Sequence, residues 1–362
     1  MYCRLVALDK CPGVRPVGIG EVWRRAIAKC VLAECGDDAK AACGSTQLCA
    51  GLEAGIEGAI HAVAARAKEH ETLDFGDTEV NDGIWTTMCE EGQVQDTTPA
   101  RTIRARMAAA QMAPADPPED DGDNEEEQPE PPPPHKQEGL LLVDAKNGFN
   151  MLSRLGMLWT VRHRAGKLSR FSFNCYCHEI HLLCRRPGNE ALYLLSKEGV
   201  TQGDPLAMAL YGIALLPLAE ILQKEYPQVM QPWYADDAAM MGQARPVAGC
   251  FMRLQAIGPD FGYYPEAEKS YFICPLADEA AAKTVFDDLE LEIQYSRGER
   301  YVGGFVGSAA MQDRWIEPKV EGWVMGVKSL ARVATRYPQS AFAGFTQSLQ
   351  SEWQYLSRCV PG

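Results

Sequence analysis

Two adjacent carboxylates are the feature of this 362-residue sequence with the clearest chemical meaning. Asp236 and Asp237 follow Tyr234 and Ala235 between two apolar stretches, a position typical of a hairpin tip. Adjacent carboxylates repel each other unless a cation neutralises them, and divalent cations such as Mg²⁺ prefer oxygen ligands. The pair therefore indicates a divalent metal site, although an ordinary Asp-Asp turn would have the same sequence.

A third carboxylate, Asp144, ends the apolar run 140–143 and precedes a helical pattern. Two strand ends lying side by side would bring Asp144 next to Asp236 and Asp237. Three carboxylates can hold two Mg²⁺ ions roughly 4 Å apart, one activating an attacking hydroxyl and one stabilising a leaving oxygen. This arrangement suits nucleotidyl transfer.

A glutamine between two glycines forms a further candidate site. Gln202 lies between Gly199 and Gly203, directly before the Asp204-Pro205 signal for the start of a helix. The glycines would permit a close backbone approach, so the Gln202 amide could lie against a nucleotide or a template base. The segment could equally be a simple helix-entry turn.

Strands and helices are interleaved without regular alternation, which predicts an α+β fold. The apolar run 206–222 is shorter than the roughly 20 residues of a membrane span and contains Pro217 and Glu220, so it predicts a buried core helix. The patterns predict strands over 3–8, 140–143, 229–234, 238–241 and 301–306, and helices over 21–34, 52–68, 149–158, 205–224 and 314–355.

Much of the acidic charge is concentrated in one segment. The chain carries a net charge of -14, from 49 acidic and 35 basic side chains. Residues 114–139 hold ten acidic residues, one lysine and eight of the 23 prolines, so this segment carries -9 and the remainder -5. It has too few apolar side chains to offset its ordering entropy, and we predict a disordered acidic insertion over 96–139.

Basic residues gather in two other segments. Residues 1–30 hold six basic and two acidic residues, and residues 150–197 hold eight basic and two acidic residues. Such local charge can hold a phosphate backbone, although a solvated charged face has the same composition. The acidic total therefore does not exclude a nucleic-acid partner, and it predicts modest affinity that weakens with salt.

Thirteen cysteines are scattered along the chain, and an odd number cannot all pair within one molecule. Together with an amino terminus that lacks a secretory pattern, this predicts an intracellular protein, nuclear or cytoplasmic, that is not secreted. The run 175–184 contains three cysteines and two histidines but no paired CxxC spacing. Buried thiols are favoured there over a zinc cluster.

Six motifs, in order along the chain, resemble those of reverse transcriptases, in particular of the non-LTR retrotransposon and group II intron type. Gly148 stands where that family more often has alanine. The motifs are VRPVGIGEVWRR (14–25), VDAKNGFN (143–150), GVTQGDPL (199–206), YADD (234–237), EKS (268–270) and YVGGFVG (301–307).

The resemblance implies a right-hand polymerase with an antiparallel palm sheet packed on helices. It places partial fingers in 1–95, the palm with part of the fingers in 140–310 and a partial helical thumb in 311–362. The chain begins close to the first fingers strand and its helical region stops near residue 359, so truncated fingers and thumb are expected. No endonuclease or RNase H pattern is visible.

The resemblance also implies roles for acidic and basic residues. Asp144, Asp236 and Asp237 match the aspartates that hold two Mg²⁺ ions, with Mn²⁺ as an alternative cation. These three residues would be both metal ligands and catalytic residues. Lys269 matches the lysine that protonates the pyrophosphate leaving group, although it could be an ordinary surface lysine.

A nucleotide site is implied as well. Phe149 matches the steric gate, an aromatic ring that leaves no room for a 2′-hydroxyl and so favours deoxynucleotides. Ala145 and Gln202 fall in the same pocket of the family. Lys10 and Arg15 match the fingers residues that grip the triphosphate, although either could be a solvated surface charge.

Gly303 and Gly304 match the segment that holds the primer terminus. The implied activity is RNA-directed DNA polymerisation in a retrotransposon-like element, with an RNA template, a DNA primer and deoxynucleoside triphosphates as partners and no membrane. A catalytically silent remnant that only binds RNA is the alternative. A template-independent or RNA-making polymerase is a third reading, disfavoured by Phe149.

Overall fold

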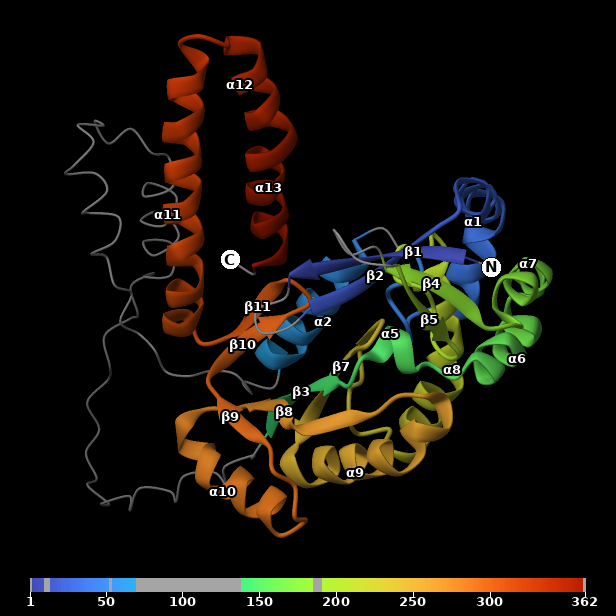
Figure 1. The fold of residues 1–362 in the computed structure, drawn as a ribbon. Helices are drawn as coiled ribbons and strands as arrows, with labels where there is room; N and C mark the ends of the chain where they lie inside the picture. Colours follow the sequence, from blue (N-terminus) through green and yellow to red (C-terminus); the bar gives the residue numbers. More distant parts are fainter. Residues whose placement is uncertain (1, 10–13, 52–53, 70–137, 185–190, 361–362) are drawn as a thin grey trace, which may run out of the picture. The chain divides into compact units, whose positions relative to one another are not determined.

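The computed structural model describes residues 2–9, 14–51, 54–69, 138–184 and 191–360 (Figure 1). All of them fall in one unit, Met1–Gly76 with Lys136–Gly362, whereas the second unit, Asp77–His135, lies outside the described residues. Nearly all of the predicted insertion 96–139 is outside them too. Glu138 and Gly139, which the sequence assigned to the insertion, begin a strand instead.

A five-stranded sheet lies at the centre of the described unit. Its central strand carries five consecutive buried residues, Gly139 to Val143, because both of its faces are covered. All of its pairings are antiparallel except that between β8 and β9. In spatial order the strands are β6 (Trp233–Tyr234), β7 (Asp237–Gln243), β3 (Glu138–Ala145), β8 (Pro265–Ile273) and β9 (Gln294–Ser296).

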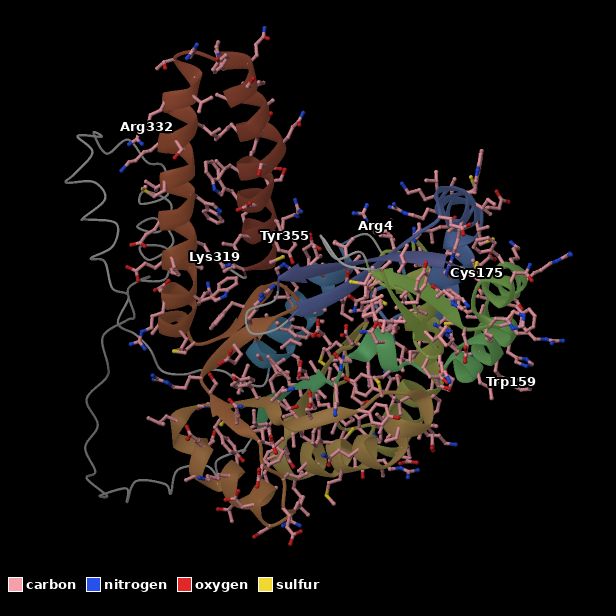
Figure 2. The ribbon with its side chains drawn as sticks, in the orientation of Figure 1. Arg4, Trp159, Cys175, Lys319, Arg332 and Tyr355 are labelled. Carbon is pink, nitrogen blue, oxygen red and sulfur yellow. The ribbon has the colours of Figure 1, made fainter. Side chains whose placement is uncertain are left out.

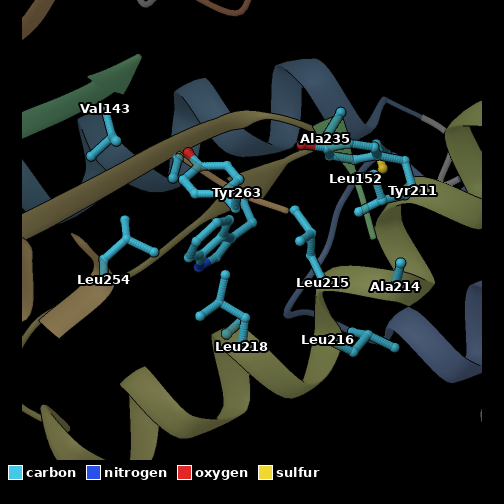
Figure 3. Packing of buried hydrophobic residues seen from close by; sticks show 14 of the residues in the cluster. Val143, Leu152, Tyr211, Ala214, Leu215, Leu216, Leu218, Ala235, Leu254 and Tyr263 are labelled. Carbon is cyan, nitrogen blue, oxygen red and sulfur yellow. The ribbon is translucent and has the colours of Figure 1, made fainter. Parts of the chain in front are cut away.

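Helices cover one face of this sheet. Leu141 and Val143 of β3 point into the larger core cluster, together with Leu215 and Leu254. Figure 3 shows Leu215 and Leu218 of α8 on the side of Tyr263 in this cluster. The helices are α8 (Ala207–Glu225), α9 (Ala244–Phe261) and α10 (Leu276–Asp287).

The opposite face is covered by a smaller cluster. Leu140 and Leu142 of β3 pack there against Ile60, Val306 and other buried residues. The covering elements are α2 (Gly55–Glu69), the hairpin β10 (Gly298–Tyr301) and β11 (Gly304–Gly307), and α13 (Gln350–Cys359). Successive side chains of β3 thus enter two different core clusters, and the smaller cluster contains residues from both ends of the chain.

A second sheet and its helices come mainly from the amino-terminal half. Its strand order is β2 (Val14–Gly20), β1 (Tyr2–Asp9), β4 (Ile180–Cys184) and β5 (Leu192–Ser196), with β1 and β4 parallel. The accompanying helices are α1 (Val22–Cys43), α5 (Gly148–Met151), α6 (Arg154–Arg164) and α7 (Gly166–Tyr176) (Figure 1).

The carboxy-terminal region is a helical hairpin. Its two long arms run antiparallel (Figure 1), and Trp323 Nε1 donates a hydrogen bond of 2.8 Å to Glu352 Oε2 between them. The segments are α11 (Ala309–Ala334), α12 (Pro338–Gly344), one π-helical turn (Phe345–Leu349) and α13. The predicted helical region from 314 to 355 is confirmed.

The predicted α+β class and most predicted elements are confirmed. Two elements were wrong, and the predicted strand 229–234 is confirmed only at Trp233–Tyr234. The expected strand 301–306 is two strands, because Val302 (φ 40°) and Gly303 (φ 92°) form a tight turn between them. The expected helix 149–158 breaks at Leu152. The Ser153 side chain then caps the next helix by accepting a hydrogen bond from Gly156 N.

Two interpretations of apolar and sulfur-rich segments can be compared with the structure. The core-helix prediction holds for α8: its length and composition would suit a membrane span, yet 67% of that window is buried. In the run 175–184, Cys175 on helix α7 is buried, as the buried-thiol interpretation predicts, whereas Cys177 and Cys184 are only half-buried.

Two buried tyrosines allow a matched test of core packing. The Tyr211 hydroxyl has no hydrogen-bond partner among the described residues, whereas the Tyr176 hydroxyl donates a 2.8 Å bond to Asp204 Oδ2. Burying an unsatisfied hydroxyl is costly. We therefore expect Tyr211→Phe to raise the free energy of unfolding by about 1 kcal/mol. Tyr176→Phe should lower it by about 2 kcal/mol because a bond to a carboxylate is lost.

Urea denaturation of the wild type and both variants measures these changes. A Tyr211→Phe protein that is less stable than the wild type would contradict the assignment of an unsatisfied hydroxyl.

Candidate active site

The largest cavity described has a volume of about 1230 Å³ and lies at one end of the five-stranded sheet. Its wall combines the end of β3, helix α5, the loop before α8, the β6–β7 turn, the start of β8 and the β10–β11 turn. Tyr355 at the base of α13 also reaches it (Figure 2). Segments far apart in the sequence therefore meet around one space.

The sheet register explains why carboxylates gather here. Val143 of β3 pairs with Ala238 of β7, so the next residue of β3, Asp144, lies beside Asp237. On the other side, Asp144 pairs with Glu266 of β8. Asp144, Asp236, Asp237 and Glu266 all line the cavity. The sequence analysis missed Glu266, whose only signal was its position two residues before the EKS motif.

The β6–β7 connection is a two-residue turn of unusual geometry. Tyr234 pairs with Asp237, leaving Ala235 and Asp236 between the strands. Ala235 has φ 54°, a left-handed conformation that is uncommon for a residue with a side chain. The buried Tyr263 hydroxyl donates a 2.9 Å hydrogen bond to the Asp236 carbonyl oxygen. A buried side chain thus fixes the backbone carbonyl of Asp236 in the turn.

Gly148 is required by the close approach of α5 to this turn. A Cβ atom at Gly148 would lie 2.7 Å from Asp236 Cβ and 2.8 Å from the Tyr211 hydroxyl oxygen. Such distances are not tolerated without movement of one partner. An alanine at this position would not fit here.

Phe149 stands on a buried aromatic support. Its ring stacks on that of Tyr211 with centroids 4.5 Å apart and planes at 18°. Burial raises the pKa of the Tyr211 hydroxyl well above its ordinary value, so this support stays uncharged. Phe149 itself is half-buried and lines the cavity, where one of its edges can meet a ligand.

The Gln202 loop is tied to the second sheet and to α1. Gly18 N donates a 2.9 Å hydrogen bond to the Gln202 carbonyl oxygen. Arg24 of α1 forms an ion pair of 2.6 Å with Asp204, and both side chains are buried. An ion pair of this kind specifies a position because removing either partner leaves a buried charge. Sequence reasoning had assigned Asp204 only to helix capping and had missed Arg24.

Lys269 lies on the opposite wall of the cavity. Its Nζ contacts Glu266 Oε2 at 2.6 Å, and this hydrogen bond raises the pKa of the Lys269 ammonium. The nearby Arg300 also lines the cavity. In the β10–β11 turn, which follows Arg300, the Tyr355 hydroxyl donates a 3.1 Å hydrogen bond to the Val302 carbonyl oxygen.

Most of the predicted site residues meet in this cavity. Gly304 does not line it: a Cβ there would meet Ile60 at 2.5 Å, so Gly304 packs behind the turn. Lys10 lies outside the described residues, and for Arg15 only the backbone in β2 is described. The residues brought together are Asp144, Ala145, Phe149, Gln202, Asp236, Asp237, Lys269 and Gly303.

The carboxylates of the cavity are the type of ligand that a hard divalent cation prefers. Asp144, Asp236 and Asp237 offer only oxygen donors, which Mg²⁺ and Mn²⁺ prefer and soft metals do not. In the described part of the chain, however, no three His, Cys, Asp or Glu side chains already stand as a metal-binding group. The metal role of the three aspartates therefore stays a prediction.

Comparisons with known proteins give only weak structural similarities. No family model and no curated protein matches the sequence. Apo telomerase from Candida tropicalis is similar at 10% identity and a TM-score of 0.42, over 84% of this chain and 47% of that one. Its form truncated from the C-terminal domain scores 0.40 at 10% identity, over 84% and 53%.

A third solved structure, telomerase from Candida albicans with a TWJ fragment of telomeric RNA, has 10% identity and a TM-score of 0.40, over 85% of this chain and 45% of that one. The chain thus spans about half the length of these solved chains. At such TM-scores the similarities assign neither fold family nor activity, and function must be argued from the cavity itself.

Gly148→Ala tests the close approach of α5 to the aspartate turn. We expect the new methyl group to displace Asp236 and to weaken Mn²⁺ binding roughly tenfold, as changes beside metal ligands commonly do. Titration of the protein with Mn²⁺, followed by electron paramagnetic resonance, measures this. The control is Gly322→Ala on α11, where a Cβ meets nothing within 4 Å. Equal Mn²⁺ affinity in both variants would contradict the prediction.

Proposed function

We propose that this chain is an RNA-directed DNA polymerase, a reverse transcriptase of the retrotransposon-like type that uses two divalent cations for nucleotidyl transfer. The observation that carries the proposal is the convergence, in one cavity, of Asp144, Asp236 and Asp237 with Phe149 and Gln202. These residues come from three separate motifs of the reverse-transcriptase resemblance, and their order in the sequence alone did not require them to meet.

The cavity electrostatics support a cation-dependent reaction on a polyanion. Carboxylates outnumber the cationic side chains along its wall. Asp144, Asp236 and Asp237 would hold Mg²⁺ or Mn²⁺, and such ions lower the pKa of a primer hydroxyl and stabilise charge on a leaving phosphate oxygen. Without them, the negative wall would repel a nucleoside triphosphate.

Two side chains of the cavity have separate tasks in this proposal. Phe149 lies under the incoming sugar and excludes a 2′-hydroxyl, and its stacking on Tyr211 fixes the ring plane. Lys269 is protonated at neutral pH, as a lysine ordinarily is, so Nζ can donate a proton to the departing pyrophosphate. Gln202 binds the nucleotide from the loop that the Arg24–Asp204 ion pair holds.

The larger parts of the proposed polymerase follow from this site. The five-stranded sheet with α8 and α9 is the palm, and the second sheet with α1 belongs to the fingers. The helices α11 to α13 form the thumb, and the β10–β11 turn with Gly303 holds the primer terminus. The partners are an RNA template, a DNA primer and deoxynucleoside triphosphates, in an intracellular setting.

A second candidate function is RNA binding without catalysis, and one surface favours it. The hairpin of α6 and α7 exposes four Lys and Arg side chains, Arg162, Arg164, Lys167 and Arg170, and contains no acidic residue. It also exposes 66% of Trp159 (Figure 2) and 56% of Phe173. Exposed aromatic rings beside cations suit stacked bases and phosphates of a single strand. This surface is compatible with the polymerase as well, so only the carboxylates separate the two functions.

Primer extension on an RNA template with Mg²⁺ tests the polymerase. Asp236→Asn keeps the side-chain shape but removes its charge, and it should lower the extension rate by roughly 100- to 1000-fold. The exposed Asp313→Asn on α11 is the control and should extend primers like the wild type. A wild-type protein that binds RNA but never extends a primer would establish the second candidate instead.

Phe149→Val tests the sugar selection. The smaller side chain leaves the Tyr211 support in place but opens space at the sugar, so ribonucleotide incorporation should rise by roughly 10- to 100-fold relative to deoxynucleotide incorporation. The kcat/KM ratio for the two nucleotides measures this. Phe149→Tyr retains the ring and should keep the wild-type ratio. An unchanged ratio in Phe149→Val would remove Phe149 from this role.

A further inference from the structure

A buried glutamine from a remote segment contacts the aspartate turn through both ends of its amide. Gln47 lies in the connection between α1 and α2, and only 1% of its surface is exposed. Its Nε2 donates a 3.2 Å hydrogen bond to the Ala235 carbonyl oxygen. The Ala235 N–H in turn donates a 2.8 Å bond to Gln47 Oε1. One side chain thus satisfies both backbone polar groups of Ala235.

Ala235 is the residue of the turn that most needs such support. Its φ of 54° is a conformation that costs a residue with a side chain roughly 1 to 2 kcal/mol, and its side chain is buried. A buried N–H or carbonyl without a partner would add a further penalty. The two bonds from Gln47 therefore favour this backbone conformation over extended alternatives.

The direction of the carboxylates depends on the same conformation. Asp236 directly follows Ala235, so a change in the Ala235 backbone would rotate the Asp236 side chain away from the cavity. Tyr263 donates its hydrogen bond to the Asp236 carbonyl oxygen, so it does not take the place of Gln47 at Ala235. Gln47 and Tyr263 therefore act on successive peptide groups of the turn.

The surroundings of Gln47 keep its amide in this position. Leu48 N donates a 2.8 Å hydrogen bond to the Trp233 carbonyl oxygen, which aligns the segment with β6. Gly212 in the middle of α8 leaves the necessary space, since a Cβ there would lie 2.9 Å from Gln47 Cγ and 2.8 Å from Cys49 Sγ. Glycine is unfavourable inside a helix, so its presence at this contact suits a need for close approach.

We infer that Gln47 is a positioning residue of the proposed polymerase, which sets the left-handed conformation at Ala235 and thereby the direction of the Asp236 carboxylate. The inference rests on the proposed function for its catalytic consequence. The amide acts through the turn and does not touch the substrate. It links the amino-terminal segment, 188 residues earlier in the chain, to the metal-binding turn.

Gln47→Leu tests the catalytic consequence. It removes both hydrogen bonds at similar volume, and misplacement of a reacting group commonly costs about 100-fold in rate. We expect kcat for primer extension to fall by about that factor with KM for the deoxynucleotide unchanged. The matched control is Gln231→Leu, a buried glutamine whose amide has no partner among the described residues. It should keep the wild-type kcat.

Gln47→Glu supplies a pH readout that a merely structural residue would not give. A neutral carboxyl can accept from the Ala235 N–H and donate to its carbonyl oxygen, as the amide does, whereas an ionised carboxylate only accepts. Burial raises the pKa of the introduced carboxyl. The kcat of this variant relative to the wild type should therefore rise as the pH falls through that pKa. A ratio independent of pH would overturn the inference.

Ala235→Gly provides the rescue, because glycine adopts a left-handed conformation without the penalty. In the Gln47→Leu background it should restore kcat by about tenfold. The same double-mutant cycle can be measured by the free energy of unfolding. Gln47→Leu should lower this free energy less when position 235 is glycine than when it is alanine.

The two proposals can fail separately. A wild-type chain that never extends a primer overturns the polymerase, while the folding cycle still decides the role of Gln47. Additive effects in that cycle overturn the positioning role, whatever the activity. A Gln47→Leu variant with the kcat of Gln231→Leu overturns it as well.

Discussion

Repulsion between neighbouring carboxylates at the end of one sheet is the constraint on which the cavity depends. Asp144, Asp237 and Glu266 lie on three adjacent strands, and Asp236 lies in the β6–β7 turn directly before Asp237. The sheet hydrogen bonds fix the strands but not the turn. The turn is instead held by buried side chains from elsewhere, and its geometry at Ala235 is one that the local sequence would not choose.

Elsewhere around the cavity, too, buried side chains support the residues that line it. Buried groups such as Tyr211 and the Arg24–Asp204 pair make the structural contacts, and the residues that could meet a ligand remain partly accessible. The Tyr355 hydroxyl makes such a structural contact with the β10–β11 turn, because it donates a hydrogen bond to the Val302 carbonyl oxygen. A ligand-facing side chain can therefore keep its freedom to bind while its backbone is fixed.

The candidate site residues could be predicted from the sequence because their types are unusual where they stand. A carboxylate at the end of an apolar strand, as at Asp144, and a carboxylate pair in a turn, as at Asp236, need no knowledge of distant contacts. Gln47 has no comparable signal, since a single glutamine after a helix is unremarkable until its partner is known. The contact spans 188 residues, and only the assembled fold reveals it.

The two wrong elements have different causes, one local and one distant in the sequence. In 301–306 the apolar pattern continued through the turn, so only the positive φ of Val302 and Gly303 marks the reversal of the chain. The break in 149–158 depends on Gly262, whose backbone packs against Met151 and Ser153 from another part of the sequence. Periodicity describes which face is buried, but it cannot describe a neighbour that interrupts the element.

Charge is distributed so that attraction and catalysis would be separated in space. Carboxylates outnumber cationic side chains along the cavity wall, whereas the α6–α7 hairpin carries basic residues without acidic ones. Arg164 and Lys167 of that hairpin are partly neutralised by Glu220 and Asp38, so its field is modest and salt would screen it. A nucleic acid drawn to the hairpin would still face repulsion at the carboxylates. Divalent cations remove that repulsion, so they would control entry of the polyanion into the cavity as well as the chemistry within it.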